Sequence, residues 1–320
     1  MTATWQQELK QALRNDHPTG LINQPGYDPA AAGLFAPVIT DTLLQAIKQA
    51  TDPAPLWRQF LPIQAEQKNP AGYVPDPVGD AAATQVPGLI HKYHGRVLLI
   101  ASGSCAVNCR YCFRRHFPYR QSYAPRNQWQ ASIDYIQADD SIHEVILSGG
   151  DPLTLSTKQL AGLTAQLATI DHVKTLRIHS RMPVVLPARI DDEFHTWAES
   201  LSCHKVMVLH VNHPSELSPA ARTAIARLRK LGFVLLNQSV MLHGINDQAS
   251  TLAQLSHQLF EQGVLPYYLH QFDPVQNAAH FAVSPARTRA IHQQLMQQLP
   301  GYLVPKLVQE VAGEPHKTPL

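Results

Sequence analysis

Short apolar runs alternate with longer amphipathic segments along most of this chain. The apolar runs are rich in valine, leucine and isoleucine, and they begin at residues 96, 144, 173, 205, 233 and 265. Apolar residues at helical spacing fill intervening segments at residues 159–170, 194–201, 220–232 and 251–263. After the first, longer interval the runs begin about 30 residues apart, which is the length of one strand-helix-strand unit. The pattern therefore predicts a parallel sheet whose outer face is covered by helices.

Two later helices carry a recognisable start. Ser218 and Ser284 each precede a proline, which places a capping hydroxyl before a residue suited to the first helical position. Six strand-helix units predict an α/β fold with an incomplete (β/α)6 barrel over residues 91–285. The expected flanking parts are a helical region with proline-rich loops at residues 1–90 and a C-terminal segment at residues 286–320, with a helix, a short strand at 302–308 and a tail.

Composition and charge exclude several classes of protein. With 320 residues, 44% of them hydrophobic, the chain can bury a complete core. The polar N-terminus and the lack of an apolar run of about 18 residues indicate neither a signal peptide nor a membrane span. A net charge of +2, from 26 basic and 24 acidic residues, provides no basic stripe for nucleic acid. Because three of the four cysteines are clustered, a reducing compartment is indicated, and we expect a cytoplasmic protein.

The candidate chemistry begins directly after the first apolar run. Cys105, Cys109 and Cys112 have CxxxCxxC spacing, whereas Cys203 precedes the fourth strand and is expected at the opposite end of the barrel as an inert thiol. A structural zinc site is one interpretation, but such sites use four closed ligands and this loop offers three. Three thiolates can instead hold a 4Fe-4S cluster and leave its fourth iron open. The carboxyl ends of parallel strands are where catalytic groups gather, so this loop is a candidate reactive centre.

The cysteine spacing, with Tyr111 before the last cysteine and a barrel strand before the first, resembles that of the radical S-adenosylmethionine (SAM) enzymes. The resemblance implies that SAM binds the open iron. It also implies that an external one-electron reductant drives SAM cleavage to a 5'-deoxyadenosyl radical. The SGGDP stretch after the second strand matches the SAM-binding turn of these enzymes, with residues Ser148, Gly149, Gly150 and Asp151. An ordinary strand-to-helix turn would also explain this stretch.

From about residue 73 onward, the chain resembles one subfamily, the lysine 2,3-aminomutases. The matching stretches include DPVGD, PGLIHKYHGRVLL, CRYCFRRHF, LSGGDPL, NQSVMLHGIND, PYYLHQFDPVQNAAHF and YLVPKLVQEVAGEPHKTPL. The resemblance implies pyridoxal 5'-phosphate (PLP) as a further cofactor, bound covalently by the catalytic Lys317 and contacted by Tyr93, Arg96 and Gln238. A solvated tail lysine is the alternative for Lys317, and GEPH before it replaces the glycine-rich run of the family. A PLP lysine here requires the C-terminal segment to close the barrel mouth.

Three charged residues bear on the substrate. By resemblance, Arg114 holds the carboxylate of lysine, while Asp273 and Glu310 bind its distal ammonium. The two acids could instead form structural ion pairs with Lys306 or Arg181. Relatives that act on glutamate need no anionic pocket, so the acids favour L-lysine as the substrate. Glu310 stands where aspartate is more usual in the long enzymes of the family, which alters the pocket by a methylene.

We expect the chain to lack the cysteine-containing C-terminal extension of the long forms. This short form resembles the branch that converts (S)-α-lysine to (R)-β-lysine for attachment to translation elongation factor P. The implied partners are elongation factor P and a ligase similar to lysyl-tRNA synthetase, linked through the small product, and we expect a monomer or small homo-oligomer. Two other hypotheses remain: a radical SAM enzyme that acts on another amino acid or without PLP, and a non-catalytic iron-sulfur electron carrier.

Overall fold

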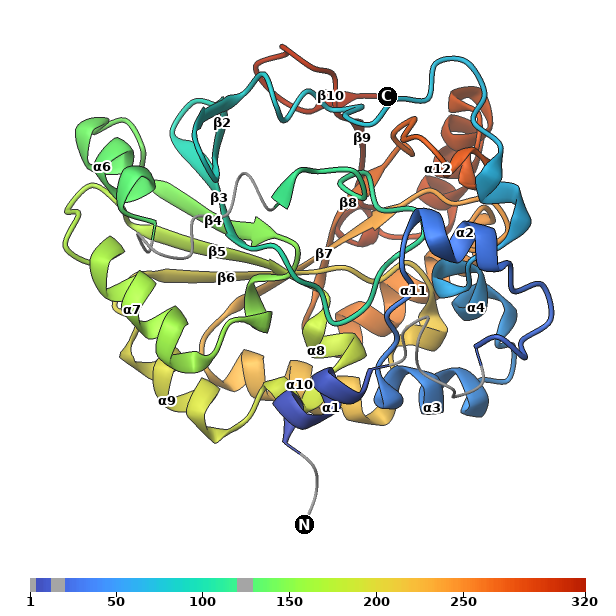
Figure 1. Cartoon of the computed structure of the whole chain (residues 1–320), viewed down its shortest axis with the longest axis horizontal. Helices are drawn as coiled ribbons and strands as arrows, with labels where there is room; N and C mark the ends of the chain where they lie inside the picture. Colours follow the sequence, from blue (N-terminus) through green and yellow to red (C-terminus); the bar gives the residue numbers. More distant parts are fainter. Residues whose placement is uncertain (1–3, 13–20, 120–128) are drawn as a thin grey trace.

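A sheet of parallel strands forms the centre of the molecule in the computed structural model, which describes residues 4–12, 21–119 and 129–320. The six predicted strands are present as β3 (Arg96–Ser102), β4 (Glu144–Gly149), β5 (Thr175–Ser180), β6 (His204–Leu209), β7 (Val234–Val240) and β8 (Leu265–His270). They pair in parallel and in sequence order (Figure 1). The predicted α/β partial barrel is confirmed.

Shorter strands extend this sheet at both edges. β1 (Thr84–Val86) and β2 (Leu89–Tyr93) add antiparallel strands beside β3, while β9 (Lys306–Gln309) runs parallel to β8 and pairs with the short β10 (Thr318–Pro319). The strand expected at 302–308 begins later than predicted. The reason is that Gly301–Leu303 form a 3-10 turn and Pro305 has no N–H to pair. In the described chain the sheet is therefore an open one, with β1 and β10 at its ends.

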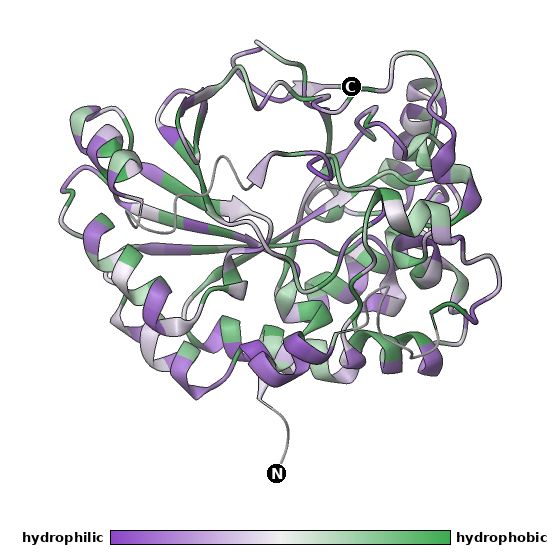
Figure 2. Ribbon diagram, viewed as in Figure 1, coloured by the Kyte–Doolittle hydropathy of each residue, from purple (hydrophilic) through white to green (hydrophobic). Residues whose placement is uncertain are grey.

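Helices follow the strands, as the amphipathic pattern predicts. They are α6 (Gln130–Ala138), α7 (Thr157–Leu167), α8 (Met182–Val185), α9 (Asp192–Ser200), α10 (Pro219–Lys230), α11 (Ala249–Glu261) and α12 (Pro285–Gln298). The Ser218 hydroxyl accepts from the Ala221 amide at 3.2 Å, and the Ser284 hydroxyl accepts from the Arg287 amide at 3.3 Å. Polar and apolar residues are interspersed along the longer of these helices (Figure 2), as one buried and one exposed face require, whereas the short α8 is apolar and buried throughout. Within the described ranges, none of the helices could cross a bilayer.

The N-terminal region packs against the barrel. Its elements are α1 (Trp5–Gln11), α2 (Pro29–Leu34), α3 (Asp41–Gln49), α4 (Ala54–Phe60) and a 3-10 turn at Gln64–Gln67. Trp5, Leu56 and Phe60 are buried in the same apolar cluster as Leu147 and Ile178 of the barrel strands. The boundary expected after residue 90 falls within β2, the strand that pairs with β3. The shared core means that these helices stabilise the barrel.

Candidate active site

The three clustered cysteines lie on the loop after β3, at the carboxyl end of the sheet. Cys105, Cys109 and Cys112 are free, partly buried thiols. Burial and the neighbouring cysteines raise the pKa of Cys105 well above its usual range and that of Cys112 to about 11, so a cationic group is needed to ionise them together. Within the described chain, no three His, Cys, Asp or Glu side chains converge on a single metal ion. Three thiols on one loop match the number of protein ligands of a cluster that keeps one iron open.

A buried ion-pair network anchors this loop to the N-terminal region. Arg110 donates from Nε and Nη2 to the two Glu66 oxygens at 2.8 and 2.6 Å, and Arg115 Nη2 donates to the same carboxylate at 2.9 Å. The three side chains are fully buried. Because loss of one partner would leave a buried charge uncompensated, the network holds the loop in one geometry.

Two glycines let the turn after β4 approach the cysteine loop closely. Gly149 has a φ of +114°, and a Cβ there would lie 2.5 Å from the Ser102 carbonyl oxygen. A Cβ on Gly150 would lie 2.4 Å from the Ser104 carbonyl oxygen. The Gly150 amide also donates to the Ser102 carbonyl at 2.8 Å. The turn predicted to bind SAM is therefore adjacent to the cysteine loop, and no side chain fits between their backbones at these two positions.

Asp151, the last residue of that predicted SAM turn, is engaged by the protein itself. Its carboxylate accepts from the Ser180 hydroxyl at 2.8 Å and from the amides of Leu153, Arg181 and Met182. Burial raises the pKa of this carboxyl, although the hydrogen bonds act in the opposite direction. These bonds join the glycine turn to the end of β5, so Asp151 fixes the position of the turn.

Arg181 connects the cysteine loop to the neighbouring loops. Its Nη1 donates to the Cys109 sulfur at 2.8 Å and to the Tyr111 hydroxyl. Its Nη2 donates to the Gln59 side-chain oxygen at 2.6 Å and to the Glu216 carboxylate at 2.5 Å. A guanidinium within hydrogen-bonding distance stabilises the thiolate of a predicted cluster ligand. Its carboxylate partner is thus Glu216 and neither of the acids predicted for the substrate.

A line of alternating charges crosses the barrel mouth. Arg114 Nε and Lys92 Nζ each lie 2.6 Å from the Asp80 carboxylate. Lys92 Nζ also lies 2.8 Å from Glu310 Oε1, and Lys317 Nζ lies 2.5 Å from Glu310 Oε2. Against the effect of burial, the adjacent cations lower the pKa of Asp80, and they lower that of Glu310 to about 2. Both acids are therefore ionised at neutral pH, within one network that contains Arg114 and Lys317.

Asp273 lies beside this network without joining it. Its carboxylate makes no hydrogen bond or ion pair within the described part of the chain. Burial and the charge of Glu310 raise its pKa to about 7, although Lys317 and Lys92 act in the opposite direction. A poorly solvated carboxylate without a partner is unfavourable, so this side chain suits a cation that a ligand supplies.

The other residues predicted to contact PLP lie around Lys317 or on the adjacent strands. Tyr93 is on β2, and its pKa is raised by burial and by the acid that pairs with Lys317. The Arg96 guanidinium, at the start of β3, stacks on Tyr93 with Cζ 4.7 Å from the ring centre. Gln238 is on β7, where its Nε2 lies 3.0 Å from His210 Nε2. The structure thus groups Tyr93 with Arg96 near Glu310, whereas Gln238 contacts the loop after β6.

Buried histidines on the inner strands provide polar groups without partners. Burial lowers the pKa of His210 and His270 to about 3, and it lowers that of His179 well below its usual range. The positive charge of Lys317 also contributes to lowering the pKa of His179 and His270. The Nε2 atoms of these two residues have no hydrogen-bond partner within the described chain. Neutral imidazoles of this kind fit a polar cofactor bound beside Lys317.

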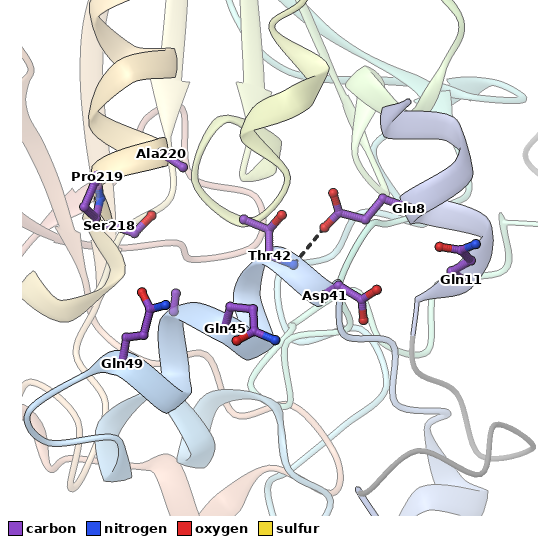
Figure 3. A pocket seen from close by; sticks show the side chains of 10 residues that line it. Glu8, Gln11, Asp41, Thr42, Gln45, Gln49, Ser218, Pro219 and Ala220 are labelled. Carbon is purple, nitrogen blue, oxygen red and sulfur yellow. Dashed lines mark hydrogen bonds between the residues drawn. The ribbon is translucent and has the colours of Figure 1, made fainter. Parts of the chain in front are cut away.

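Two hollows lie away from all of these residues. One has a volume of 460 Å³ and lies between α1, α3 and the start of α10, where the Thr42 amide donates to Glu8 at 2.8 Å (Figure 3). The other has a volume of 390 Å³ and is lined by α7 and by residues 200–204. Cys203 lines the second hollow and precedes β6, so it lies at the amino end of the sheet, away from the cysteine loop. Neither hollow is lined by a predicted site residue.

Asp80 and Lys92 belong to the site, although the sequence analysis assigned them no role there, and Arg181 enters it as a partner of Cys109 and Glu216. Asp80 and Lys92 occur within the matched stretches DPVGD and PGLIHKYHGRVLL, and a charge inside such a stretch was the available signal. The pairing itself has no local signature, because Lys92 and Glu310 are 218 positions apart.

The fold and the cysteine loop define the class of this protein. The family model of the radical SAM superfamily matches residues 99–255, from within β3 to within α11. Over 291 residues the chain is 46% identical to L-lysine 2,3-aminomutase of Escherichia coli (strain K12), covering 91% of this chain and 85% of the relative. The Haemophilus influenzae protein of the same name is 45% identical over 289 residues, covering 90% and 86%. The chain belongs to the lysine 2,3-aminomutase family.

A more distant relative is longer. L-lysine 2,3-aminomutase of Clostridium subterminale is 35% identical over 284 residues, which are 88% of this chain and 68% of that protein. Enzymes of this family use a 4Fe-4S cluster, SAM and PLP. The three free thiols, the close glycine turn, and a partly buried lysine beside unpartnered imidazoles fit these groups.

Proposed function

We propose that this protein moves the α-amino group of L-lysine to C3, which gives β-lysine. The E. coli and H. influenzae relatives carry the name of this activity. The observation that supports the proposal most is Asp273, a partly buried carboxylate near Glu310 that has no hydrogen-bond or ion-pair partner in the described chain. A substrate with a cationic side chain supplies that partner, whereas a neutral or acidic side chain leaves the carboxylate unpaired.

We further propose which residues hold the cofactors. The cluster is bound by Cys105, Cys109 and Cys112, and the SAM site is bordered by Ser148, Gly149, Gly150 and Asp151. PLP is bound covalently by Lys317, with further contacts from Tyr93, Arg96 and Gln238. When bound, the cluster and SAM supply the radical that starts the reaction, and PLP holds the migrating amino group.

The charged side chains at the barrel mouth orient the substrate by its two ends. Asp80 accepts from Arg114 Nε at 2.6 Å and the Ser148 hydroxyl accepts from Nη1 at 3.4 Å, so Nη2 is the Arg114 nitrogen that we assign to the substrate carboxylate. Asp273 and Glu310 receive the distal ammonium. Glu310 Oε2 lies 2.5 Å from Lys317 Nζ, so the proposed site for the distal ammonium adjoins the lysine that would hold PLP. With both ends held, the carbons between them have a fixed position, which radical chemistry at one carbon requires.

The finer assignment concerns the product and its use. We propose that the product is (R)-β-lysine and that a ligase similar to lysyl-tRNA synthetase attaches it to elongation factor P in the cytoplasm. The support is that the chain is more similar to the E. coli relative, at 46% identity over 85% of that protein, than to the clostridial one, at 35% identity over 68%. The protein needs no contact with elongation factor P in this scheme, because the small product links the two.

The experiment is an anaerobic assay of the reconstituted enzyme with SAM, PLP and dithionite. L-lysine, L-glutamate and L-norleucine are offered separately, and the products are separated as chiral derivatives. We expect (R)-β-lysine from L-lysine and at most traces from the other two. Efficient conversion of norleucine would contradict the role of the acids, and (S)-β-lysine would contradict the link to elongation factor P.

A further inference from the structure

Lys92 holds together the two acids that flank the substrate site. Its Nζ donates to the Val78 carbonyl at 2.8 Å and to Glu310 Oε1 at 2.8 Å, and it lies 2.6 Å from Asp80 Oδ1. The side chain is only 14% exposed, and that of Asp80 is 2% exposed. Two of the three N–H donors of the ammonium are used by Val78 and Glu310, and the contact with Asp80 Oδ1 is an ion pair without hydrogen-bond geometry. Lys92 is therefore held by three groups of the protein itself.

Each of the two acids bound by Lys92 controls one end of the substrate site. Asp80 accepts from Arg114 Nε at 2.6 Å and so sets the direction of the group proposed to bind the carboxylate. Glu310, held through Oε1, presents Oε2 toward the end proposed to bind the distal ammonium. The Lys92 side chain, which lies between Asp80 and Glu310, therefore sets the distance between the two ends of the substrate site.

The position of Lys92 in the fold strengthens this reading. β2, which carries Lys92, lies near one end of the open sheet, and β9, which precedes Glu310, lies near the other. The Asp80 loop and the C-terminal segment are also in contact, because a Cβ on Gly79 would lie 2.9 Å from the Ala312 Cβ. The Lys92 ion pairs thus join the two edges of the sheet where sheet hydrogen bonds do not.

We propose that Lys92 is a positioning residue that fixes the spacing between Arg114 and Glu310, and that this spacing selects a diamino acid of the length of lysine over shorter ones. The inference rests on the proposed function, since it assigns the two ends to one substrate. A purely structural ion pair would affect stability and all amino acids alike. A spacing role affects the ratio between lysine and ornithine, which carries the same charges one methylene closer together.

The test measures binding to the anaerobic holoenzyme without reductant, so that no turnover occurs. Dissociation constants for L-lysine, L-ornithine and L-norleucine are determined for wild type, Lys92→Met and Lys92→Arg. Lys306→Met is the matched control, because Lys306 is an exposed lysine on β9, the strand next to Glu310. Thermal unfolding and PLP content are recorded for each variant, which makes a folding defect visible.

For Lys92→Met we expect the affinity for lysine to fall by about 10- to 100-fold, because two buried acids lose a partner. The preference for lysine over ornithine should fall by about tenfold, while norleucine binding changes little. Lys92→Arg keeps the charge but substitutes a longer planar group. It should therefore retain near-normal stability and still lose several-fold of the lysine-to-ornithine preference, and Lys306→Met should match wild type.

An unchanged lysine-to-ornithine ratio in both Lys92 variants would overturn the inference while leaving the proposed function intact. A wild-type holoenzyme that does not bind lysine would overturn the proposed function, and the inference with it. If Lys92→Met does not fold, the ratio measured for Lys92→Arg decides.

Discussion

Lys317 and Glu310 form an ion pair of 2.5 Å, seven positions apart in sequence. They meet because the chain turns back between β9 and β10, so that Thr318 pairs with Gln309. Lys317 is proposed to bind PLP, and Glu310 is proposed to bind the distal ammonium of the substrate. In this proposal one carboxylate lies beside both the lysine that would hold PLP and the distal end of the substrate.

The role of Lys317 is tested by Lys317→Ala. The variant should lose the covalent PLP adduct, because an imine needs an amine and Lys317 is the proposed one. The measurement is borohydride reduction followed by mass spectrometry of the C-terminal peptide, with Lys306→Ala as the control. If Lys317→Ala still formed a PLP adduct at wild-type stoichiometry, another residue would have to be the PLP-binding lysine. Cluster assembly should be unaffected, since the cluster uses none of these groups.

The role of Asp273 is tested by Asp273→Asn. Removing one member of a buried charge pair costs about 3 to 5 kcal/mol, so kcat/KM for lysine should fall by roughly two to three orders of magnitude. Iron content and PLP absorbance should stay at wild-type levels. The assay compares lysine with norleucine, because norleucine lacks the ammonium. Near-normal lysine turnover in the variant would make Asp273 a structural residue.

The raised pKa of Asp273 also predicts a pH dependence of lysine binding. Its carboxylate is charged above a pKa of about 7 and neutral below it, while the distal ammonium of lysine stays charged throughout this range. Affinity for lysine should therefore rise as pH increases from 6 to 8, roughly following the ionisation of one group, and this rise should be absent in Asp273→Asn. Binding to the unreduced holoenzyme across this range is the measurement, and a wild-type profile that falls with pH would contradict the assignment.

The same shift predicts a gain of stability in Asp273→Asn. A group whose pKa is raised on folding binds protons more tightly in the folded state, so its contribution to stability is lost as pH rises from about 4 through about 7. At pH 8 the variant should be more stable than wild type by about 2 to 4 kcal/mol, and the difference should shrink toward pH 4. Denaturant unfolding of both proteins at the two pH values checks this. A variant less stable than wild type at pH 8 would mean that Asp273 has a protein partner.

The cluster ligands are tested against a cysteine of the same chain. Cys105→Ala, Cys109→Ala and Cys112→Ala should each lose most of the bound iron and SAM cleavage, because a three-thiolate site has no ligand to spare. Cys203→Ala, at the other end of the sheet, is the matched control and should keep both. Iron analysis and the visible absorbance of anaerobic protein are the measurements. Loss of bound iron in Cys203→Ala would contradict the proposal that three cysteines hold the cluster and leave one iron open.

Arg181 predicts an effect on the reduction potential. Its removal takes a positive charge and a hydrogen bond away from Cys109, so the potential of the cluster should become more negative. Arg181→Met also leaves Glu216 buried without its partner, at a cost of about 3 to 5 kcal/mol, and Arg181→Met with Glu216→Gln should recover part of that stability. Potentiometric titration of the cluster in both variants separates the two effects. An unchanged potential would restrict Arg181 to a structural role.

The sequence was sufficient to predict what depends on local pattern. The six parallel strands follow from apolar runs, and the starts of α10 and α12 follow from Ser218 and Ser284 beside prolines. The strand near residue 305 was predicted too early because Pro305 interrupts pairing in an otherwise apolar run. For the site, family resemblance led to Arg114, Glu310 and Lys317, which the structure joins in one network.

What the sequence could not supply is the pairing between distant residues. No local feature of the sequence indicates that Lys92 forms ion pairs with Asp80 and Glu310, which the fold brings together. For Asp151, the place in SGGDP predicted a role at the SAM site. In the fold its carboxylate accepts hydrogen bonds from Ser180 and Arg181 at the end of β5. Position in a motif identifies a neighbourhood, and only the three-dimensional contacts assign the atoms within it.

The close approach at Gly149 and Gly150 limits how this enzyme can change. The Cβ of an alanine at either position would lie within 2.5 Å of the carbonyl oxygen of Ser102 or Ser104. These are backbone atoms, so they cannot move away by a change of side-chain rotamer. The turn after β4 can therefore lie this close to the cysteine loop only because Gly149 and Gly150 carry a hydrogen atom where other residues carry a Cβ. Substitutions that alter substrate preference can occur among the charged side chains at the barrel mouth, whereas Gly149 and Gly150 cannot be replaced by any other amino acid without moving the backbone.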